Sequence, residues 1–322
     1  MLGHIVDSVA STRWSGRATD EDEVLVDRLE TRRRNVQVAL GIIWLVDAAL
    51  QFQPFMFTKA FVSNVLAPTA SGNPWLFYRP MVWADHFMIH DIAWWNTLYA
   101  MLQLLIALGL FWRPTVRLAL GTSIVWSVTV WWFAEGFGGA FSGSSPLAGE
   151  PGAVMLYALV AVLIWPTSRS DASSVAQNGP WGQQGAIAAW IVLWVDFAVY
   201  FLIPANRMPQ ALHDLVYGMA SGEPGWVQSI DRSMAAVLAG RGLAISLTLA
   251  LLSAGVALAI MIPPLVRPAL ITALVVAGFI WLAQDFGCIF TSQGTDVNSG
   301  PLIAILAWTF WPLKRPPRTS RR

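Results

Sequence analysis

The chain has 322 residues, of which 56% are hydrophobic and only 12% are charged, with 18 tryptophans and a net charge of +1. Because a soluble domain carries roughly 25% charged residues, this composition excludes an ordinary soluble protein and indicates a polytopic membrane protein. The small net charge gives no reason to expect a nucleic-acid partner. The single cysteine, Cys288, excludes an internal disulfide and a Cys-x-x-Cys redox pair.

Apolar segments recur along the chain, and about 20 apolar residues suffice to cross a bilayer. We expect eight transmembrane helices at residues 36–57, 92–111, 116–133, 152–165, 186–203, 243–262, 269–286 and 301–313. The fourth and eighth are short, so we expect them to tilt or to start inside the membrane beneath a buried loop. Two outer loops, 57–67 and 208–219, are each expected to form a short amphipathic helix or a cap over the bundle.

Basic residues collect on one side of this topology. Residues 1–35 hold six arginines and the segment 314–322 holds five lysines and arginines, and Arg113, Arg117, Arg169 and Arg267 fall in loops of the same side. By the positive-inside rule that side is cytoplasmic, so both termini are expected inside a bacterial inner (plasma) membrane. Residues 20–35 are expected to form a cytoplasmic helix that runs into an uncleaved first span.

The sequence repeats itself at an offset of 150 residues. Pro54 falls on Pro204, residues 70–74 (ASGNP) fall on 220–224 (ASGEP), and at an offset of 149 residues 132–138 (WFAEGFG) fall on 281–287 (WLAQDFG). A fixed period predicts one structural unit used twice. We therefore expect a cytoplasmic segment 1–35, a four-helix repeat 36–166, a linker 167–185, a second repeat 186–313 and a basic tail 314–322. An even number of spans makes the two repeats parallel.

Two aspartates, Asp47 and Asp196, lie mid-span at matching positions of the repeats. A carboxylate at the bilayer centre costs roughly 2.5–3.5 kcal/mol, so each should face the bundle and have a partner. The candidate partners are Gln51, Gln53, Tyr200, tryptophan and threonine side chains, or the two aspartates themselves across the pseudo-two-fold axis. Three roles remain open: a hydrogen-bonded staple between helices, ligand binding, or proton exchange.

Acidic residues also begin or occupy the glycine-rich loops after the third and seventh spans. Glu135, Glu150, Asp285 and Asp296 could together form an acidic outer mouth suited to a cation or to proton entry. The alternative is that Asp296 and its neighbour Asn298 form turns and cap the last helix.

A local motif at residues 85–91 (DHFMIHD) suggests metal ligation. His86 and His90 at i and i+4 would share one helix face, with Asp85 as a further ligand. The second repeat has no counterpart, and the alternative is an interfacial helix start.

A four-span unit with an acidic residue in its first helix and Trp-x-Ala-[Glu/Gln]-[Gly/Asp]-Phe-Gly at the end of its third resembles the DoxX/DoxD-like membrane family, here duplicated. The resemblance implies four-helix bundles and a membrane subunit that works with quinones in sulfur-compound oxidation. It supplies no catalytic motif for individual residues of this chain.

These observations lead to one expected function and two alternatives. The first is an integral membrane redox-associated subunit that holds a lipophilic ligand, a quinone or a lipid, in an intramembrane cavity and acts with a partner membrane or extracytoplasmic protein. Its polar contacts would be Asp47, Asp196, Glu135, Asp285 and Asp296. The alternatives are a proton-coupled small-molecule transporter and a non-catalytic structural subunit.

Overall fold

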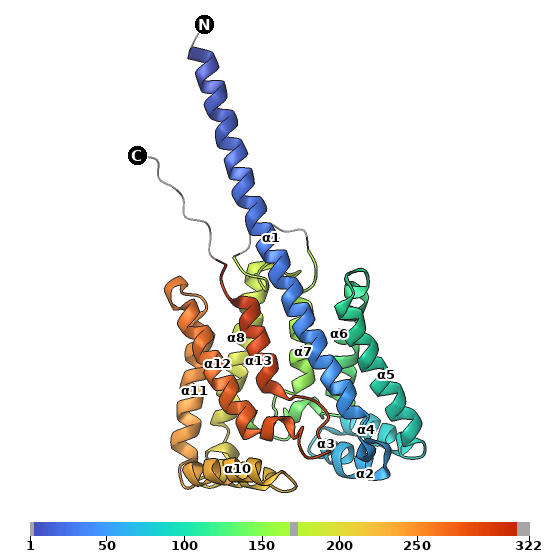
Figure 1. The fold of residues 1–322 in the computed structure, drawn as a ribbon. Helices are drawn as coiled ribbons and strands as arrows, with labels where there is room; N and C mark the ends of the chain where they lie inside the picture. The colour runs from blue at the N-terminus through green and yellow to red at the C-terminus, as the bar shows by residue number, and fades with distance from the viewer. Residues whose placement is uncertain (1–2, 168–172, 314–322) are drawn as a thin grey trace.

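The computed structural model describes residues 3–167 and 173–313, with side chains from Glu23 onward. In this part of the chain every regular element is helical, which confirms the all-α prediction. The bundle consists of α1 (Gly3–Gln51), α5 (Ile92–Phe111), α6 (Val116–Phe133), α7 (Ala153–Leu163), α8 (Gly182–Leu202), α11 (Gly242–Ala259), α12 (Val266–Ala283) and α13 (Ser299–Phe310). The helices of this bundle run between two ends of the molecule (Figure 1). The end where α13 finishes is called the terminal end, and the opposite one the distal end.

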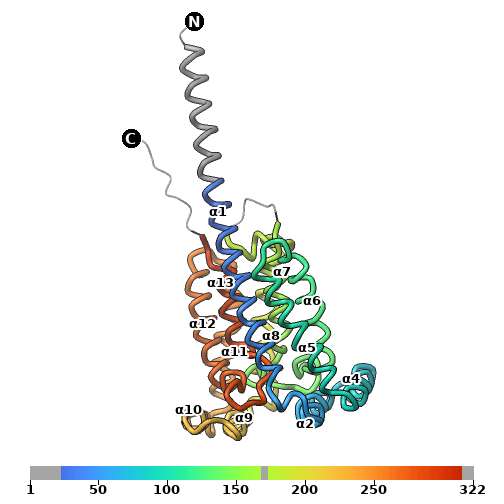
Figure 2. Tube along the Cα trace, turned by 45° about the vertical axis from the view of Figure 1, so that its right-hand side comes forward, coloured from blue at the N-terminus to red at the C-terminus, as the bar shows by residue number. Residues whose placement is uncertain are grey.

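Both halves of the described chain use the same helix contacts. α1 packs along α5 as α8 packs along α11, and α6 packs on α7 as α12 packs on α13. The halves meet where α13 packs against α7 and α1, so the middle of the bundle is built from both (Figure 2).

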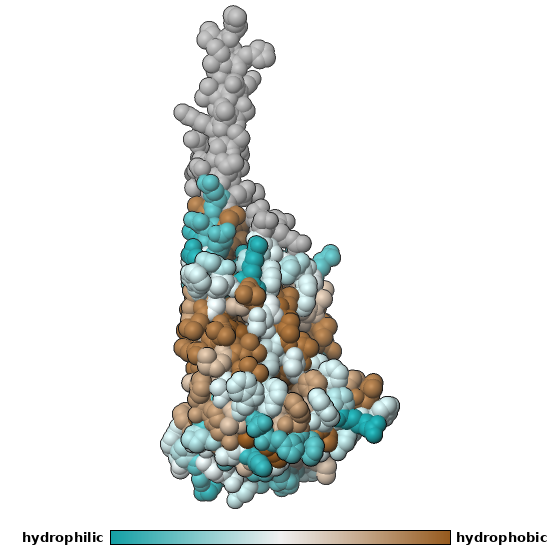
Figure 3. All heavy atoms as spheres, turned by 90° about the vertical axis from the view of Figure 1, so that its right-hand side faces the viewer, coloured by the Kyte–Doolittle hydropathy of each residue, from teal (hydrophilic) through white to brown (hydrophobic). Residues whose placement is uncertain are grey.

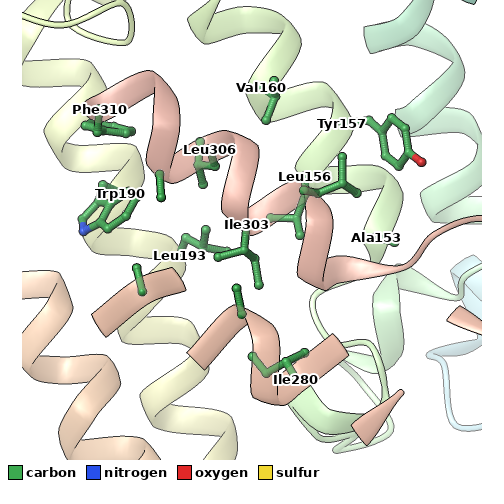
Figure 4. Packing of buried hydrophobic residues seen from close by; sticks show 14 of the residues in the cluster. Ala153, Leu156, Tyr157, Val160, Trp190, Leu193, Ile280, Ile303, Leu306 and Phe310 are labelled. Atoms are coloured by element: carbon green, nitrogen blue, oxygen red, sulfur yellow. The ribbon is translucent and has the colours of Figure 1, made fainter. Parts of the chain in front are cut away.

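The core between the halves is continuous and apolar. Ile303 and Leu306 of α13 point into the space between α7 and α8, and the rings of Phe310 and Trp190 lie 4.8 Å apart (Figure 4). Glycines bring the helices close: a Cβ on Gly300, at the start of α13, would lie 2.9 Å from the carbonyl oxygen of Ala277 in α12. Small residues at such crossings let helix backbones approach each other.

Five helical stretches of the described chain are long and apolar enough to cross a membrane, which supports a multi-pass membrane protein. They are Ile92–Phe111, Arg113–Phe133, Gly182–Leu202, Gly242–Ala259 and Pro263–Ala283. On the face seen in Figure 3, apolar residues gather across the middle of the bundle and hydrophilic residues lie at its ends.

The other three expected spans differ from the prediction. The first does not reach residue 57, because α1 ends at Gln51 and Pro54 begins a separate 3-10 turn, Pro54–Phe57. The fourth and eighth are the short apolar helices Ala153–Leu163 and Ser299–Phe310. These two helices are shorter than their neighbours, so the loops before α7 and α13 occupy the part of the bundle that the helices do not reach.

At the terminal end, three consecutive arginines of α1 donate hydrogen bonds to other segments of the chain. Arg32 donates to the carbonyl oxygen of Trp311 (2.7 Å), Arg33 donates to Asn178, and Arg34 donates to the carbonyl oxygens of Leu110 (2.7 Å) and Phe111. Carbonyls at helix C-termini lack intrahelical partners, so Arg32 and Arg34 satisfy those at the ends of α13 and α5 and complement the helix dipoles.

The expected linker 167–185 is packed rather than free where the structure describes it. The amide of Ala176 donates to the carbonyl oxygen of Thr309 (3.0 Å), and the amide of Leu313 donates to that of Ser173 (2.9 Å). α8 begins at Gly182, slightly before the expected start of the second repeat. Residues 168–172 and the basic segment 314–322 lie outside the described residues.

Short helices form at both places where the sequence predicts them at the distal end. They are α2 (Lys59–Phe61), a π-helical turn Val62–Leu66 and α3 (Ala67–Ala70) in the first half, and α9 (Ala211–Met219) in the second. Two further helices, α4 (Trp75–Met88) and α10 (Gly225–Leu238), follow them at an offset of 150 residues. They were not predicted, and they carry residues of the site described next.

Candidate functional site: buried carboxyl clusters at the distal end

Asp47 is buried in the last turns of α1, with 2% of its surface exposed. The hydroxyl of Tyr157 on α7 donates to its Oδ2, and the backbone amide of Val297 also hydrogen-bonds to its carboxylate. Asp296, the neighbour of Val297, lies close enough to act electrostatically on Asp47. The partners are thus Tyr157 of the same half and the loop around Val297 of the other half, neither of which was among the candidates named from the sequence.

Glu135 lies just beyond the end of α6 and accepts a hydrogen bond from the backbone amide of Val154 (3.3 Å) in the first turn of α7. It therefore satisfies an orphan donor at a helix start. Glu135 and Asp296 both line a cavity of about 300 Å³ whose wall consists mostly of glycine, serine, alanine and threonine. Burial, and next the charge of Asp296, raise the pKa of Glu135 to about 8.

Asp296 itself supports the turn before α13. Its Oδ1 accepts the amide of Asn298 (2.6 Å), its Oδ2 accepts the hydroxyl of Thr295 (3.0 Å), and Asn298 in turn accepts the amide of Ser299 (2.8 Å). The expected turn and cap role is therefore present. Burial raises the pKa of Asp296.

Asp196 in α8 meets Glu150, which is 1% exposed in the loop before α7. Their carboxyl groups lie within hydrogen-bonding distance. Two carboxyl groups can form a hydrogen bond only when one of them carries a proton. Burial first, and then Asp196, raise the pKa of Glu150 to about 10.

A third cluster combines Glu223, which precedes α10, Asp231 of α10, and Asp285 and Cys288 after α12. Glu223, Asp231 and Asp285 are 4%, 0% and 0% exposed, and none of their carboxylate oxygens has a hydrogen-bond donor or a salt bridge among the described residues. One ligand atom from each of Glu223, Asp285 and Cys288 lies within 4.8 Å of the others. Asp231 lies within hydrogen-bonding distance of Asp285.

The electrostatics of this cluster favour bound protons or a bound cation. Burial, followed by Asp231 and Glu223, raises the pKa of Asp285 to about 8. Burial, followed by the carboxylates around it, raises the pKa of Cys288 to about 12. Buried negative charges without a positive partner are expensive, so the cluster is neutral through protonation or is compensated by an ion.

The backbone at residues 285–288 is strained. Asp285, Phe286, Gly287 and Cys288 have φ values of 50°, 56°, 81° and 54°. The first half has the same conformation at residues 136–139, where φ is 56°, 60°, 64° and 81°, with the sequence Gly-Phe-Gly-Gly. The second half therefore places an aspartate and a cysteine where the first half uses glycine.

The ring contacts around these loops also correspond in the two halves. Phe137 packs edge-on to Trp131 at 4.9 Å, and Phe286 packs edge-on to Trp281 at 5.1 Å. The indole N–H groups of both tryptophans donate to carbonyl oxygens just before α7 and α13, at 2.6 and 2.9 Å. The two loops thus share their backbone conformation and ring contacts, but one carries Gly136 and Gly139 where the other carries Asp285 and Cys288.

The predicted metal residues near α4 form a looser arrangement. α4 ends at Met88, so His90 follows the helix; the rings of His86 and His90 are exposed and lie 5.3 Å apart. Asp85 is buried, and burial raises its pKa to about 6. Among the described residues, the one group of three His, Cys, Asp or Glu side chains with ligand atoms all within 4.8 Å is Glu223, Asp285 and Cys288.

The sequence reasoning singled out Asp285 but missed Glu223, Asp231, Tyr157 and the pairing of Glu150 with Asp196. The sequence does contain an indication of Glu223 and Asp231. At an offset of 150, Glu223 replaces Asn73 and Asp231 replaces Met81, so two acidic residues appear in one repeat only.

No family model, curated protein or solved structure matches the chain.

Proposed function

We propose that this chain is a bacterial plasma-membrane protein of two parallel four-helix repeats that binds a divalent metal cation of the zinc type at its outer end in exchange for protons. In this topology α1, α7 and α13 complete eight crossings. The distal end faces outward, and the terminal end, with its arginines, faces the cytoplasm. The shared helix contacts and the matching ring contacts of the two halves support the duplication.

The observation that carries the proposal is the one-copy cluster of Glu223, Asp231, Asp285 and Cys288. At the four corresponding positions the first half has Asn73, Met81, Gly136 and Gly139. Shared architecture requires none of these acids, and left-handed backbone costs roughly 1–2 kcal/mol at a non-glycine residue. A ligand held by Glu223, Asp285 and Cys288, with Asp231 beside Asp285, would offset both the strain and the buried charge.

Glu223, Asp285 and Cys288 supply two carboxylates and a thiolate, which form a mixed hard and soft donor set, and Asp231 lies beside Asp285. Zn²⁺ accepts carboxylate oxygen and cysteine sulfur together, whereas Ca²⁺ and Mg²⁺ prefer oxygen alone. Glu223, Asp285 and Cys288 must all be deprotonated to bind a metal. Since the pKa of Asp285 is about 8 and that of Cys288 about 12, binding near neutral pH releases protons.

The direct test is calorimetric titration of Zn²⁺ into the purified full-length protein. We expect one site, and we expect the double variant Asp285→Gly/Cys288→Gly to bind at least roughly 100-fold more weakly, because it loses two ligands. These substitutions restore the residues that the first half carries on the same backbone, so the variant is expected to fold.

The matched control is Asp214→Asn. The Asp214 side chain lies on α9, also at the distal end, and is 71% exposed. The control should titrate as the wild type does. Binding that survives in the glycine double variant, or no Zn²⁺ binding in the wild type, would contradict the proposed site.

Proton-coupled transport is a second candidate, favoured by the polar residues behind the other distal cavity. Tyr157, Asp47, Asp296 and Glu135 connect the interior of the bundle with that cavity. Zn²⁺-driven acidification or alkalinisation inside proteoliposomes loaded with a pH dye would detect such coupling. Loss of the signal in Asp47→Asn with retained Zn²⁺ binding would favour transport, and no signal in the wild type would exclude it for this ion.

The lipophilic-ligand function expected from the sequence has weaker geometric support. The cavity beside Glu135 is small, about 300 Å³, and its wall of small residues with Glu135, Asp296 and Asn298 suits a small hydrophilic ligand better than a quinone ring. A quinone, a redox partner protein and membership of the DoxX-like family rest on the short sequence resemblance.

A further inference from the structure

A basic pocket opens at the terminal end between α1 and the ends of α12 and α13. Its volume is about 690 Å³, and its wall includes Arg28, Arg32 and Arg267. Asp27 is the one acidic side chain of that wall, so the positive charges outnumber the negative ones. Thr31 and Asn35 add hydrogen-bonding groups.

An apolar groove begins where the basic pocket ends. It has a volume of about 320 Å³ and is lined by Leu274 of α12 and by Ala304, Ile305, Trp308 and Trp311 of α13 and its end. Trp311 belongs to both walls, so the two spaces adjoin. Arg267 lies in the first turn of α12 and Leu274 two turns further on, which aligns the groove with the helix axes.

We propose that this composite site binds one anionic phospholipid of the cytoplasmic leaflet. Its phosphate lies among Arg28, Arg32 and Arg267, and an acyl chain follows the groove past Trp308. A basic pocket at the cytoplasmic ends of transmembrane helices recognises an anionic head group, and the apolar groove explains why the ligand is a lipid rather than a free anion.

Arg32 and Arg267 have different roles in the pocket. Arg32 already donates one hydrogen bond to the carbonyl of Trp311 at 2.7 Å, so it fixes the corner shared by the two spaces. Arg267 is exposed on the opposite wall of the pocket. Replacing Arg267 therefore removes charge without removing a contact that holds α1 to α13.

The experiment is native mass spectrometry of the delipidated full-length protein in mild detergent, with phosphatidylglycerol or phosphatidylcholine of identical acyl chains. We expect preferential retention of one phosphatidylglycerol. Arg267→Gln should lower its occupancy about fivefold, since each basic residue near the surface contributes about that factor. Trp308→Ala should also lower it, because the groove loses one of its two tryptophans.

Two controls separate this site from general charge effects. Arg232→Gln removes the same charge from an exposed residue of α10 at the distal end and should leave retention unchanged. Glycerol phosphate at equal concentration should neither bind nor compete, whereas effective competition would identify an anion site without a lipid role. Equal retention of both lipids, or an unchanged Arg267→Gln variant, would overturn the proposal.

Discussion

The carboxyl groups of Glu150 and Asp196 lie close enough to share a proton although they belong to different halves of the chain. Glu150 lies in the loop before the last helix of the first half, and Asp196 lies in the first long helix of the second. Asp296, in the loop before the last helix of the second half, acts electrostatically on Asp47 of α1. Each half therefore places a loop acid near an aspartate in the first long helix of the other half.

This pairing predicts how stability depends on pH. The pKa of Glu150 is raised from 4.5 to about 10 in the folded protein, so folding favours its protonated form. Its contribution to stability is complete below about pH 4.5 and is lost as the pH rises through about 10. We expect the melting temperature of the wild type to fall between pH 6 and pH 9.

Glu150→Gln tests the origin of that slope. The amide donates to Asp196 at every pH, so the variant should show a shallower decline of the melting temperature over the same range. Parallel pH profiles of variant and wild type, recorded by thermal unfolding in detergent, would show that the pair does not cause the dependence.

Tyr157→Phe is expected to destabilise the protein. The substitution leaves the carboxylate of Asp47, which is 2% exposed, without its hydroxyl donor. An unsatisfied buried polar group costs about 1–3 kcal/mol.

The Asp47→Asn variant and the double variant complete a thermodynamic cycle, measured by chemical denaturation. The double variant should be less destabilised than the sum of the two single changes. Strict additivity would mean that the two side chains do not interact energetically.

The strained loop predicts a conflict between stability and binding. Asp285→Gly/Cys288→Gly relieves two left-handed non-glycine residues, worth roughly 1–2 kcal/mol each, and removes a buried carboxyl group. In the absence of metal, we expect the variant to melt at a higher temperature than the wild type. Each 1 kcal/mol gained in the free energy of unfolding corresponds to a rise of about 2–4 °C. A lower melting temperature than that of the wild type would show that the two side chains stabilise the loop.

The affinity for Zn²⁺ should increase with pH. The metal displaces protons from groups whose pKa values are raised, about 8 for Asp285 and about 12 for Cys288. Each proton released makes binding about tenfold tighter per pH unit below those pKa values. Titrations at pH 6, 7 and 8 measure this slope, and an affinity that does not change with pH would exclude proton exchange at the cluster.

Much of the fold could be predicted from hydropathy and the repeat. Long apolar helices, such as α5 and α11, carry their own signal because nearly every residue is apolar. The helical loop before Ala70 and its counterpart α9 were also predicted. α4 and α10 were missed because each mixes exposed aromatic and polar residues, which is typical of helices at a surface rather than across a membrane.

The site was only partly predictable, for a physical reason. Asp47, Glu135, Asp285 and Asp296 stand out in sequence because carboxyl groups are rare near apolar spans. Their partners depend on how two distant segments pack. Tyr157 resembles any aromatic core residue, and Glu150 any loop acid, until α7 and α8 are placed in space. Glu223 and Asp231 were detectable only by asking which residues break the internal repeat.

The most direct test of the metal site is the electronic absorption spectrum of the full-length protein titrated with Co²⁺ as a spectroscopic substitute for Zn²⁺. The account predicts a near-ultraviolet thiolate-to-cobalt charge-transfer band that saturates at one equivalent, disappears on addition of Zn²⁺ and is absent from Cys288→Gly. Since Cys288 is the only cysteine of the chain, the band reports on this cluster alone. A wild-type spectrum without that band would contradict the claim that Cys288 and its carboxylate neighbours bind a metal.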